Sequence, residues 1–226
     1  LPGIFKGSKF TKVLYVDLLA MLFEILAKVR KEGLMSIEND VENPKDSPIF
    51  GKYPSLSSDH HVMEFITDYL RMMVGGNLNA IEIENLMDIE IETHHHEVET
   101  PGHVMSKVAD AVPAFGIVVA VMGVVNVMGS VGEPPAVLGK MIGGALVGTF
   151  LGILIAYGFV SPVANLLEQK AQDGAKIYQV IKVVLLASMS GYAPQVAVEF
   201  GRKTLVAAVR PTFRELEEEL KNRKGK

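Results

Sequence analysis

Two long runs without a charged side chain stand in the middle of the chain: AVPAFGIVVAVMGVVNVMGSV (Ala111–Val131) and MIGGALVGTFLGILIAYGFVSPVANLL (Met141–Leu167). As a helix, the first run would be roughly 31 Å long, because each residue adds about 1.5 Å, and this matches the hydrocarbon core of a bilayer. The second run is longer and can cross a bilayer with some tilt. Gly132-Glu133-Pro134-Pro135 separates the runs, so the sequence predicts an antiparallel hairpin of two membrane helices.

The two runs of the predicted hairpin contain small residues and prolines but no Asp, Glu, Lys, Arg or His, so by themselves they have no group that can carry a proton across lipid. Gly144, Gly148 and Gly152 recur every four residues, which lets a neighbouring backbone approach closely. Pro113 opens the first run and Pro162 lies near the end of the second. In an antiparallel pair we expect both prolines at the same membrane face, where each marks a helix start or a hinge.

The composition narrows the class of function. The 226 residues contain no cysteine, which excludes disulfides and thiolate metal sites, and the net charge of −4 argues against a nucleic-acid partner. Lys and Arg lie almost wholly outside the hairpin, and residues 132–139 contain neither. By the positive-inside rule, both flanks are expected on the cytoplasmic side and the turn on the outer side.

The flanks read as soluble helical protein, so we predict an all-α chain with three parts. Residues 1–110 form a cytoplasmic helical domain, 111–167 the membrane hairpin, and 168–226 a cytoplasmic helical extension with a tail. The periodicity and the breakers predict the following segments: helix 11–31 ended by Gly33, a short helix capped by Ser36 and ending before Pro44, a linker or surface loop 44–58, helix 59–74, helix 79–99 broken at Thr100-Pro101-Gly102, helix 168–192, helix 195–209, and a solvated or disordered tail 214–226.

Candidate chemistry is sparse. Three consecutive histidines, His94 to His96, point about 100° apart on a helix and cannot all face one metal ion, and the pair His60-His61 fares little better. The sequence has no phosphate-binding glycine loop, zinc-protease motif or nucleophile elbow, so we expect neither a cofactor nor enzymatic activity. Arg30 and Glu38 bracket the break at Gly33; the spacing alone favours a solvated helix end, but such charges can also orient a charged partner.

Six segments give the chain a close resemblance to the MotA family of flagellar stator subunits: Pro113–Val118, Val147–Leu154, Tyr157-Gly158-Phe159, Ser161-Pro162, Gly191–Pro194 and Val198–Lys203. The resemblance covers nearly the whole chain. It implies a four-span protein of the bacterial inner membrane that forms a homo-oligomeric ring around MotB. MotB supplies the membrane aspartate that carries the ion, and the ring exerts torque on the rotor protein FliG.

The resemblance also implies roles for individual residues outside and at the ends of the hairpin. Arg30 and Glu38 match the two cytoplasmic charges that engage FliG. Pro113 and Pro162 match the prolines at the cytoplasmic ends of the third and fourth spans, which couple ion transfer to conformational change.

Inside the hairpin, Thr149 matches the threonine that faces the aspartate of MotB. Tyr157, one of the few other polar groups of the second run, is assigned to the same path. Sodium-type stators tend to carry a threonine seven residues after the first proline. This chain has Ala120 there, which favours H+ as the transported ion.

Two alternatives stay open. One is a TolQ- or ExbB-like proton channel subunit that energises outer-membrane processes, although the long first flank with its two charges speaks against it. The other is a non-transporting membrane scaffold in which the glycines only pack helices. Family members have two further membrane helices before the position of Leu1, so we expect the 226 residues by themselves not to form a working stator.

Overall fold

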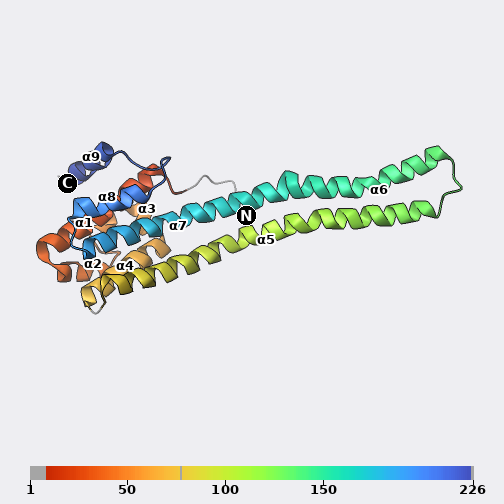
Figure 1. The fold of residues 1–226 in the computed structure, drawn as a ribbon. Helices are drawn as coiled ribbons and strands as arrows, with labels where there is room; N and C mark the ends of the chain where they lie inside the picture. Colours follow the sequence, from red (N-terminus) through yellow and green to blue (C-terminus); the bar gives the residue numbers. More distant parts are fainter. Residues whose placement is uncertain (1–8, 77, 225–226) are drawn as a thin grey trace. The chain divides into compact units, whose positions relative to one another are not determined.

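The structure, a computed structural model, describes residues 9–76 and 78–224, and within them every regular element is helical. These elements are α1 (Lys12–Glu32), η2 (Leu34–Ile37), α2 (Glu38–Glu42), η3 (Phe50–Lys52), α3 (Pro54–Ser57), α4 (His60–Gly75), α5 (Ala80–Met128), α6 (Pro135–Ile155), the π-helical turn η4 (Ala156–Val160), α7 (Ser161–Met189), α8 (Pro194–Thr204) and α9 (Phe213–Lys224). Figure 1 shows their order.

The described residues form two compact units. Residues 9–95 and 173–224 make one, called here the core unit, and residues 96–172 make the other, called the hairpin unit. The long helices α5 and α7 each contribute residues to both. The change of unit thus falls inside these two helices, at residues 95/96 and 172/173, whereas the sequence-based boundaries were placed at 110/111 and 167/168.

Helix α1 is the centre of the core unit. Thr11 caps it by accepting a hydrogen bond from the Leu14 amide (3.3 Å), and Gly33 ends it with a φ of 88°, a conformation that favours glycine. Nine of its residues are buried, among them Leu18, Leu22 and Ile25. Because α1 is enclosed in this way, it presents only its ends to solvent, and Arg30 lies at the exposed C-terminal end.

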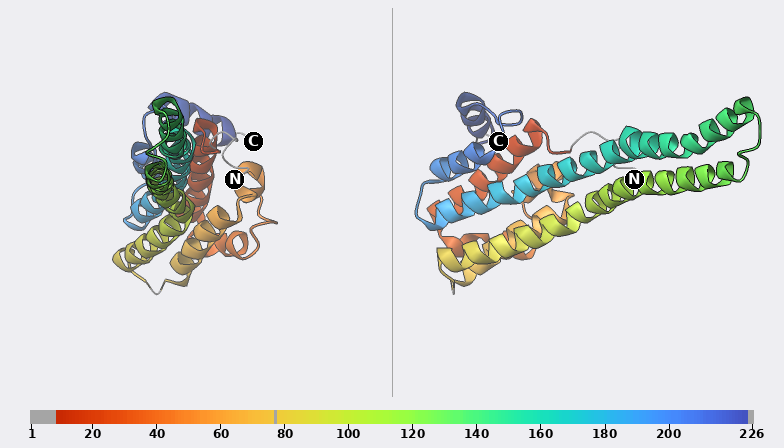
Figure 2. Two further views of the ribbon diagram at one scale, coloured as in Figure 1. Left: turned by 90° about the vertical axis from the view of Figure 1, so that its right-hand side faces the viewer. Right: turned by 45° about the vertical axis from the view of Figure 1, so that its right-hand side comes forward.

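Helices α7 and α8 pack closely against α1. Ile177, Val180 and Val184 of α7 are buried in the same core, and Gly201 of α8 has no side chain at the point where a Cβ atom would collide with Val184. Figure 2 shows α8 running beside α1. A glycine here allows the Val184 side chain to pack directly against the backbone of α8.

Two expectations for the first flank were wrong. Ser36 does not cap a helix, since its hydroxyl donates to the Gly33 carbonyl instead (2.6 Å). The stretch 44–58 is not a surface loop, because Phe50, Tyr53 and Leu56 are buried and the short helices η3 and α3 form around them. Isolated apolar residues among prolines and serines gave no periodicity that could have revealed this.

The described part of the tail, residues 214–224, lies in the ordered helix α9, where disorder was one expectation, and residues 225–226 lie outside the described residues. Helix α9 begins with a reciprocal cap between Thr212 and Glu215, and buries Leu216 and Leu220 against the core. Arg223 reaches Asp17 of α1 at 2.8 Å. Helix α8, in turn, ends at Thr204 rather than near residue 209. The charges of the tail therefore belong to a docked amphipathic helix.

The hairpin unit differs from expectation at Thr100-Pro101-Gly102, where α5 continues instead of breaking and remains helical through Pro101 and Pro113. Thr100 donates its hydroxyl to the His96 carbonyl (2.8 Å), next to the carbonyl that Pro101 cannot serve. Gly102 is needed for packing: a Cβ atom there would lie 2.6 Å from Cγ of Glu168 on α7. The glycine permits a helix contact and does not end the helix.

The predicted hairpin is present. Helix α5 ends at Met128, residues 129–134 make the turn, and α6 begins with Pro135 at its first position. Figures 1 and 2 show α5 and α6 as two antiparallel helices joined by this turn. Both long helices, Ala80–Met128 and Pro135–Met189, contain windows that are long and apolar enough to cross a membrane.

A buried arginine links α8 to the segment that precedes α9. Arg202 is 6% exposed and donates to Glu199 from Nε (2.6 Å) and Nη2 (2.5 Å), while Nη1 reaches the Pro211 carbonyl (2.9 Å). The Arg202 hydrogen bonds hold the pKa of Glu199 below its ordinary value. Glu199 therefore contributes stability that is complete above its ordinary pKa and is lost as the pH falls through the lowered one.

We predict that Glu199→Gln lowers the free energy of unfolding of the detergent-solubilised protein by about 1–3 kcal/mol at pH 6, since charged hydrogen bonds of this kind contribute that much. The difference from wild type should shrink as the pH falls below the ordinary pKa of glutamate and through the lowered pKa of Glu199, because the wild-type carboxylate becomes neutral first in the unfolded and then in the folded protein. Denaturant titrations at several pH values measure it. Glu217→Gln, at an exposed pair with Lys221, is the control and should have little effect. A Glu199→Gln deficit that is equal at pH 6 and pH 3.5 would contradict this linkage.

Candidate functional site

The two helices of the hairpin touch through glycine. A Cβ atom on Gly116 would lie 2.7 Å from the Gly148 carbonyl oxygen, and one on Gly152 would lie 3.2 Å from the Val112 carbonyl oxygen. Nearer the turn, a Cβ atom on Gly123 would lie 2.5 Å from Cβ of Ala145. The helix backbones are therefore closer than any larger side chain would allow.

The predicted glycine stripe divides into two parts. Gly148 and Gly152 face α5, but a Cβ atom on Gly144 would meet nothing within 4 Å. The neighbouring Gly143 is equally open. Within a single chain, Gly144 thus leaves a smooth exposed surface on α6, and it does not take part in the contact between the two helices.

The polar and ion-path residues occupy different surroundings. Thr149 is partly buried and donates its hydroxyl to the Gly116 carbonyl at 3.4 Å, which is a long and weak hydrogen bond. Ala120 is buried, with 8% of its surface exposed. Tyr157 is 59% exposed and lies in the turn η4. Thr149 and Ala120 therefore lie in or beside the helix contact, whereas Tyr157 projects outward.

The two prolines lie at different levels of the hairpin. Pro113 is level with Gly152, since a Cβ atom on that glycine would be 3.5 Å from Cα of Pro113. Pro162 follows ten residues after Gly152, or about 15 Å along a helix. Pro113 lies inside α5, whereas Pro162 is the second residue of α7, directly after η4 in the helical run Pro135–Met189.

A widened turn precedes Pro162, and sequence reasoning did not predict it. In η4 (Ala156–Val160) the Ser161 amide bonds to the Ala156 carbonyl, five residues back. Pro162 itself has no N–H, so the carbonyl of Gly158 lacks its usual helical partner. Such π-turns are rare inside long helices and are often found at functional sites.

A polar cluster joins α5 to α7 beyond the prolines, and sequence reasoning missed it as well. Ser106 donates to Glu168 at 3.1 Å, and the His103 ring lies 3.7 Å from Glu168 and 3.7 Å from Glu99. His103 is therefore placed to bridge the two carboxylates when it is protonated. Spacing along the sequence could not reveal this, because the partners are 62 residues apart.

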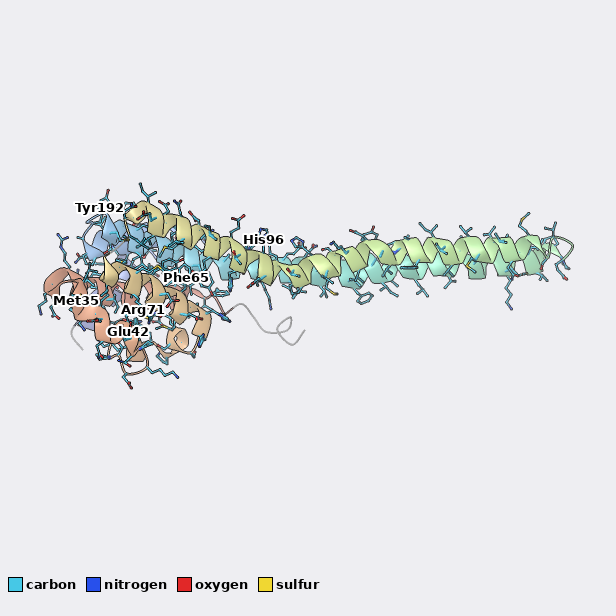
Figure 3. All side chains as sticks on the ribbon, turned by 90° about the horizontal axis from the view of Figure 1, so that it is seen from below. Met35, Glu42, Phe65, Arg71, His96 and Tyr192 are labelled. Atoms are coloured by element: carbon cyan, nitrogen blue, oxygen red, sulfur yellow. The ribbon has the colours of Figure 1, made fainter. Side chains whose placement is uncertain are left out.

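Arg30 and Glu38 form an exposed, charged end of the core unit. Arg30 lies in the last turn of α1 and donates to the Gly191 carbonyl at 3.4 Å, which is long for a hydrogen bond, and Glu38 opens α2 with its side chain exposed. Between them, η2 exposes Met35 (63%), which Figure 3 shows projecting from this end. We call residues 30–38 the charged tip. Beside it, a cavity of about 170 Å³ is lined by Leu26, Val29, Arg30, Ser188, Tyr192 and Pro194.

The histidines of α4 and α5 pack against each other. The His61 and His94 rings are 6.2 Å apart, and His94 packs on Tyr178 of α7 at 4.7 Å between ring centroids. Within residues 9–76 and 78–224, no three His, Cys, Asp or Glu side chains are grouped so that they could hold a metal ion. The histidine pairs contribute to a contact among α4, α5 and α7.

The sequence was compared with known families. The family model described as the MotA/TolQ/ExbB proton channel family matches residues 57–180, which contain the whole hairpin. The chain belongs to this family. As a member of a membrane channel family with two apolar helices in an antiparallel hairpin, it is an all-helical integral membrane protein.

Relatives within the MotA/TolQ/ExbB family place the chain more narrowly. It is 53% identical over 221 residues to Motility protein A of Escherichia coli (strain K12), which covers 98% of this chain and 75% of that protein. It is 32% identical to Chemotaxis protein LafT of Vibrio parahaemolyticus, covering 99% of this chain and 79% of that protein. Both alignments extend over the charged tip, which lies outside the residues matched by the family model.

Two solved structures share the fold. The flagellar MotAB stator complex from Bacillus subtilis is 26% identical, with a TM-score of 0.66, covering 87% of this chain and 69% of that one. The C. jejuni MotAB structure is 22% identical, with a TM-score of 0.71, covering 91% and 72%, and shows likeness of fold alone.

The helix contact of this family member predicts different outcomes for glycines on the same hairpin. Gly116→Val should lower the stability of single chains in detergent by about 1–3 kcal/mol, because the new side chain meets the α6 backbone. Thermal unfolding followed by circular dichroism measures the change. Gly144→Val adds the same atoms in open space and should lower the stability markedly less. Equal losses in the two variants would show that the helices do not pack through Gly116.

Proposed function

We propose that the protein is a stator subunit of the bacterial flagellar motor, which forms with MotB a proton channel and converts ion flow into torque on the rotor protein FliG. The observation that carries the proposal is the 53% identity to Motility protein A across 98% of the chain. The two solved structures of the same fold are MotAB complexes, which supports MotB as the partner. The relatives are motility proteins, and no enzymatic activity or cofactor is part of the proposal.

The ion path requires a partner because residues 111–131 and 141–156 contain no Asp, Glu, Lys, Arg or His. A carboxylate from MotB would lie in a low-dielectric environment that favours its neutral, protonated form. The Thr149 hydroxyl is suited to receive it, since its bond to the Gly116 carbonyl is long at 3.4 Å and can be exchanged for a carboxylate. Ala120 leaves no hydroxyl at its position to coordinate a metal cation, which favours H+ as the transported ion.

Coupling to movement is assigned to the prolines. Pro113 and Pro162 each leave a carbonyl without its helical partner, so bending there disrupts fewer hydrogen bonds than elsewhere. The turn η4 precedes Pro162, and α7 then continues to Met189, where Val184 and Leu185 are buried in the core unit. A change of shape at Pro162 would therefore reach the core that encloses α1 and its charged tip.

The protein would occupy the bacterial inner membrane as a multi-pass protein, with both flanks in the cytoplasm. The turn 129–134 contains no Lys or Arg, which supports an outward-facing turn. A homo-oligomeric ring is supported by the open glycine surface at Gly144, which a helix of another copy could contact closely.

The rotor contact is assigned to Arg30 and Glu38. In cells making the full-length protein with MotB, Arg30→Glu and Glu38→Lys should each reduce rotor engagement about tenfold, the effect of about 1.4 kcal/mol when attraction becomes repulsion. Membrane insertion, ring assembly and proton flux should remain. Torque on a tethered bead and cytoplasmic acidification measure the two activities separately.

The matched control is Lys221→Glu, which makes the same charge change at an exposed position of α9. It should leave torque unchanged. Normal torque with both tip charges reversed would remove the rotor contact from the proposal. Proton flux that does not require MotB would contradict the channel itself, and no flux with both subunits present would favour a scaffold.

A further inference from the structure

A buried ion pair lies directly behind the charged tip. Asp40 of α2 is 2% exposed, and its Oδ2 lies 2.6 Å from Nζ of Lys28 on α1, whose side chain is 29% exposed. The pair joins the last part of α1 to the short helix that follows the turn at Gly33. Among the described residues, this ion pair is the one that links α1 to α2.

The second carboxylate oxygen of Asp40 is also satisfied. Ser47, itself 3% exposed, donates its hydroxyl to Oδ1 at 2.6 Å. The Ser47 oxygen in turn accepts from the amides of Ile49 (3.2 Å) and Phe50 (3.3 Å). The carboxylate therefore connects α1, α2 and the start of η3, and a buried charge with this many partners has one preferred geometry.

The buried pair and the exposed pair are related by their spacing. Lys28 precedes Arg30 by two residues, and Asp40 follows Glu38 by two residues. Residues two apart on a helix point to nearly opposite sides. The paired side chains of Lys28 and Asp40 thus set how the two helix ends lie against each other. This arrangement in turn determines the relative positions of the two exposed charges.

We propose that Asp40 is a positioning residue, which through Lys28 holds Arg30 and Glu38 in one mutual arrangement for a charged partner surface. The inference rests on the rotor contact proposed above and adds to it the groups that orient the two charges. Ile37 and Val41 are also buried and hold the segment to the core. Apolar contacts are non-directional, however, so the ion pair is the contact that fixes orientation.

A second ion pair on the same short helix provides the control. Glu42 of α2 accepts from Arg71 of α4 at 2.7 Å, but both side chains are about half exposed. Figure 3 shows Glu42 and Arg71 near one another. Exposed pairs of this kind contribute little to geometry or stability, so Glu42→Gln changes the charge of α2 without releasing the tip.

The test uses the full-length protein with its MotB partner in a strain lacking its own stator. Asp40→Asn and Lys28→Met should each reduce torque per stator unit at least fivefold, while membrane level and ring assembly stay within twofold of wild type. Lys28→Arg keeps the charge at a position with access to solvent and should retain torque within twofold. Glu42→Gln should match wild type.

Combination with a tip variant separates positioning from folding. If Asp40 acts through Arg30 and Glu38, then Asp40→Asn added to Glu38→Gln should reduce torque by less than the product of the two single effects. A merely structural role predicts multiplied losses, a parallel fall in membrane level, and a Lys28→Arg variant as weak as Lys28→Met. Those results would overturn the proposal.

The proposal and the rotor contact fail in different ways. Loss of torque in Arg30→Glu with normal torque in Asp40→Asn would overturn only the positioning role. Normal torque in Arg30→Glu would overturn the rotor contact, and the positioning role with it.

Discussion

The structure depends on a constraint that lipid places on the hairpin: apolar side chains gain nothing by leaving lipid for each other, so two helices stay together only by close packing. Gly116, Gly148 and Gly152 meet this constraint by letting backbone touch backbone. The same close packing leaves no room and no partner for a charge inside the hairpin. An ion-carrying group therefore has to be supplied by another subunit. Close helix packing and the absence of a charge suit this chain to form the wall of a channel.

The core unit is held together differently, by one cluster of buried apolar side chains around α1. Helices α7, α8 and the short helices bury the middle of α1, and its exposed C-terminal end carries Arg30. The ion pair of Lys28 and Asp40 then matters more for geometry than for stability, since buried ion pairs are often no more stabilising than apolar groups of the same size. Asp40 explains why two exposed charges eight residues apart can act as one surface.

Sequence reasoning recovered what periodicity and composition encode. The hairpin, α1, α4 and the continuous α7 follow from apolar spacing, from the absence of charge, and from glycines such as Gly33 and Gly76. The errors have a common cause: helix-breaking residues were assumed to end helices, and polar segments were assumed to be loops or disordered. Pro101 remains in a helix, where Gly102 packs on α7. The charged tail forms α9, because Leu216 and Leu220 are buried in the core. The turn η4 and the partners of Glu168 and Asp40 depend on contacts distant in sequence, which no local pattern contains.

Whether this protein drives flagellar rotation is tested by a clean deletion of the full gene in the source bacterium. Filaments and their rotation are scored separately by microscopy, with complementation by the intact gene. We predict filaments of normal number that do not rotate, and recovery of rotation on complementation. Normal swimming in the deletion strain that contains no second stator gene would contradict it.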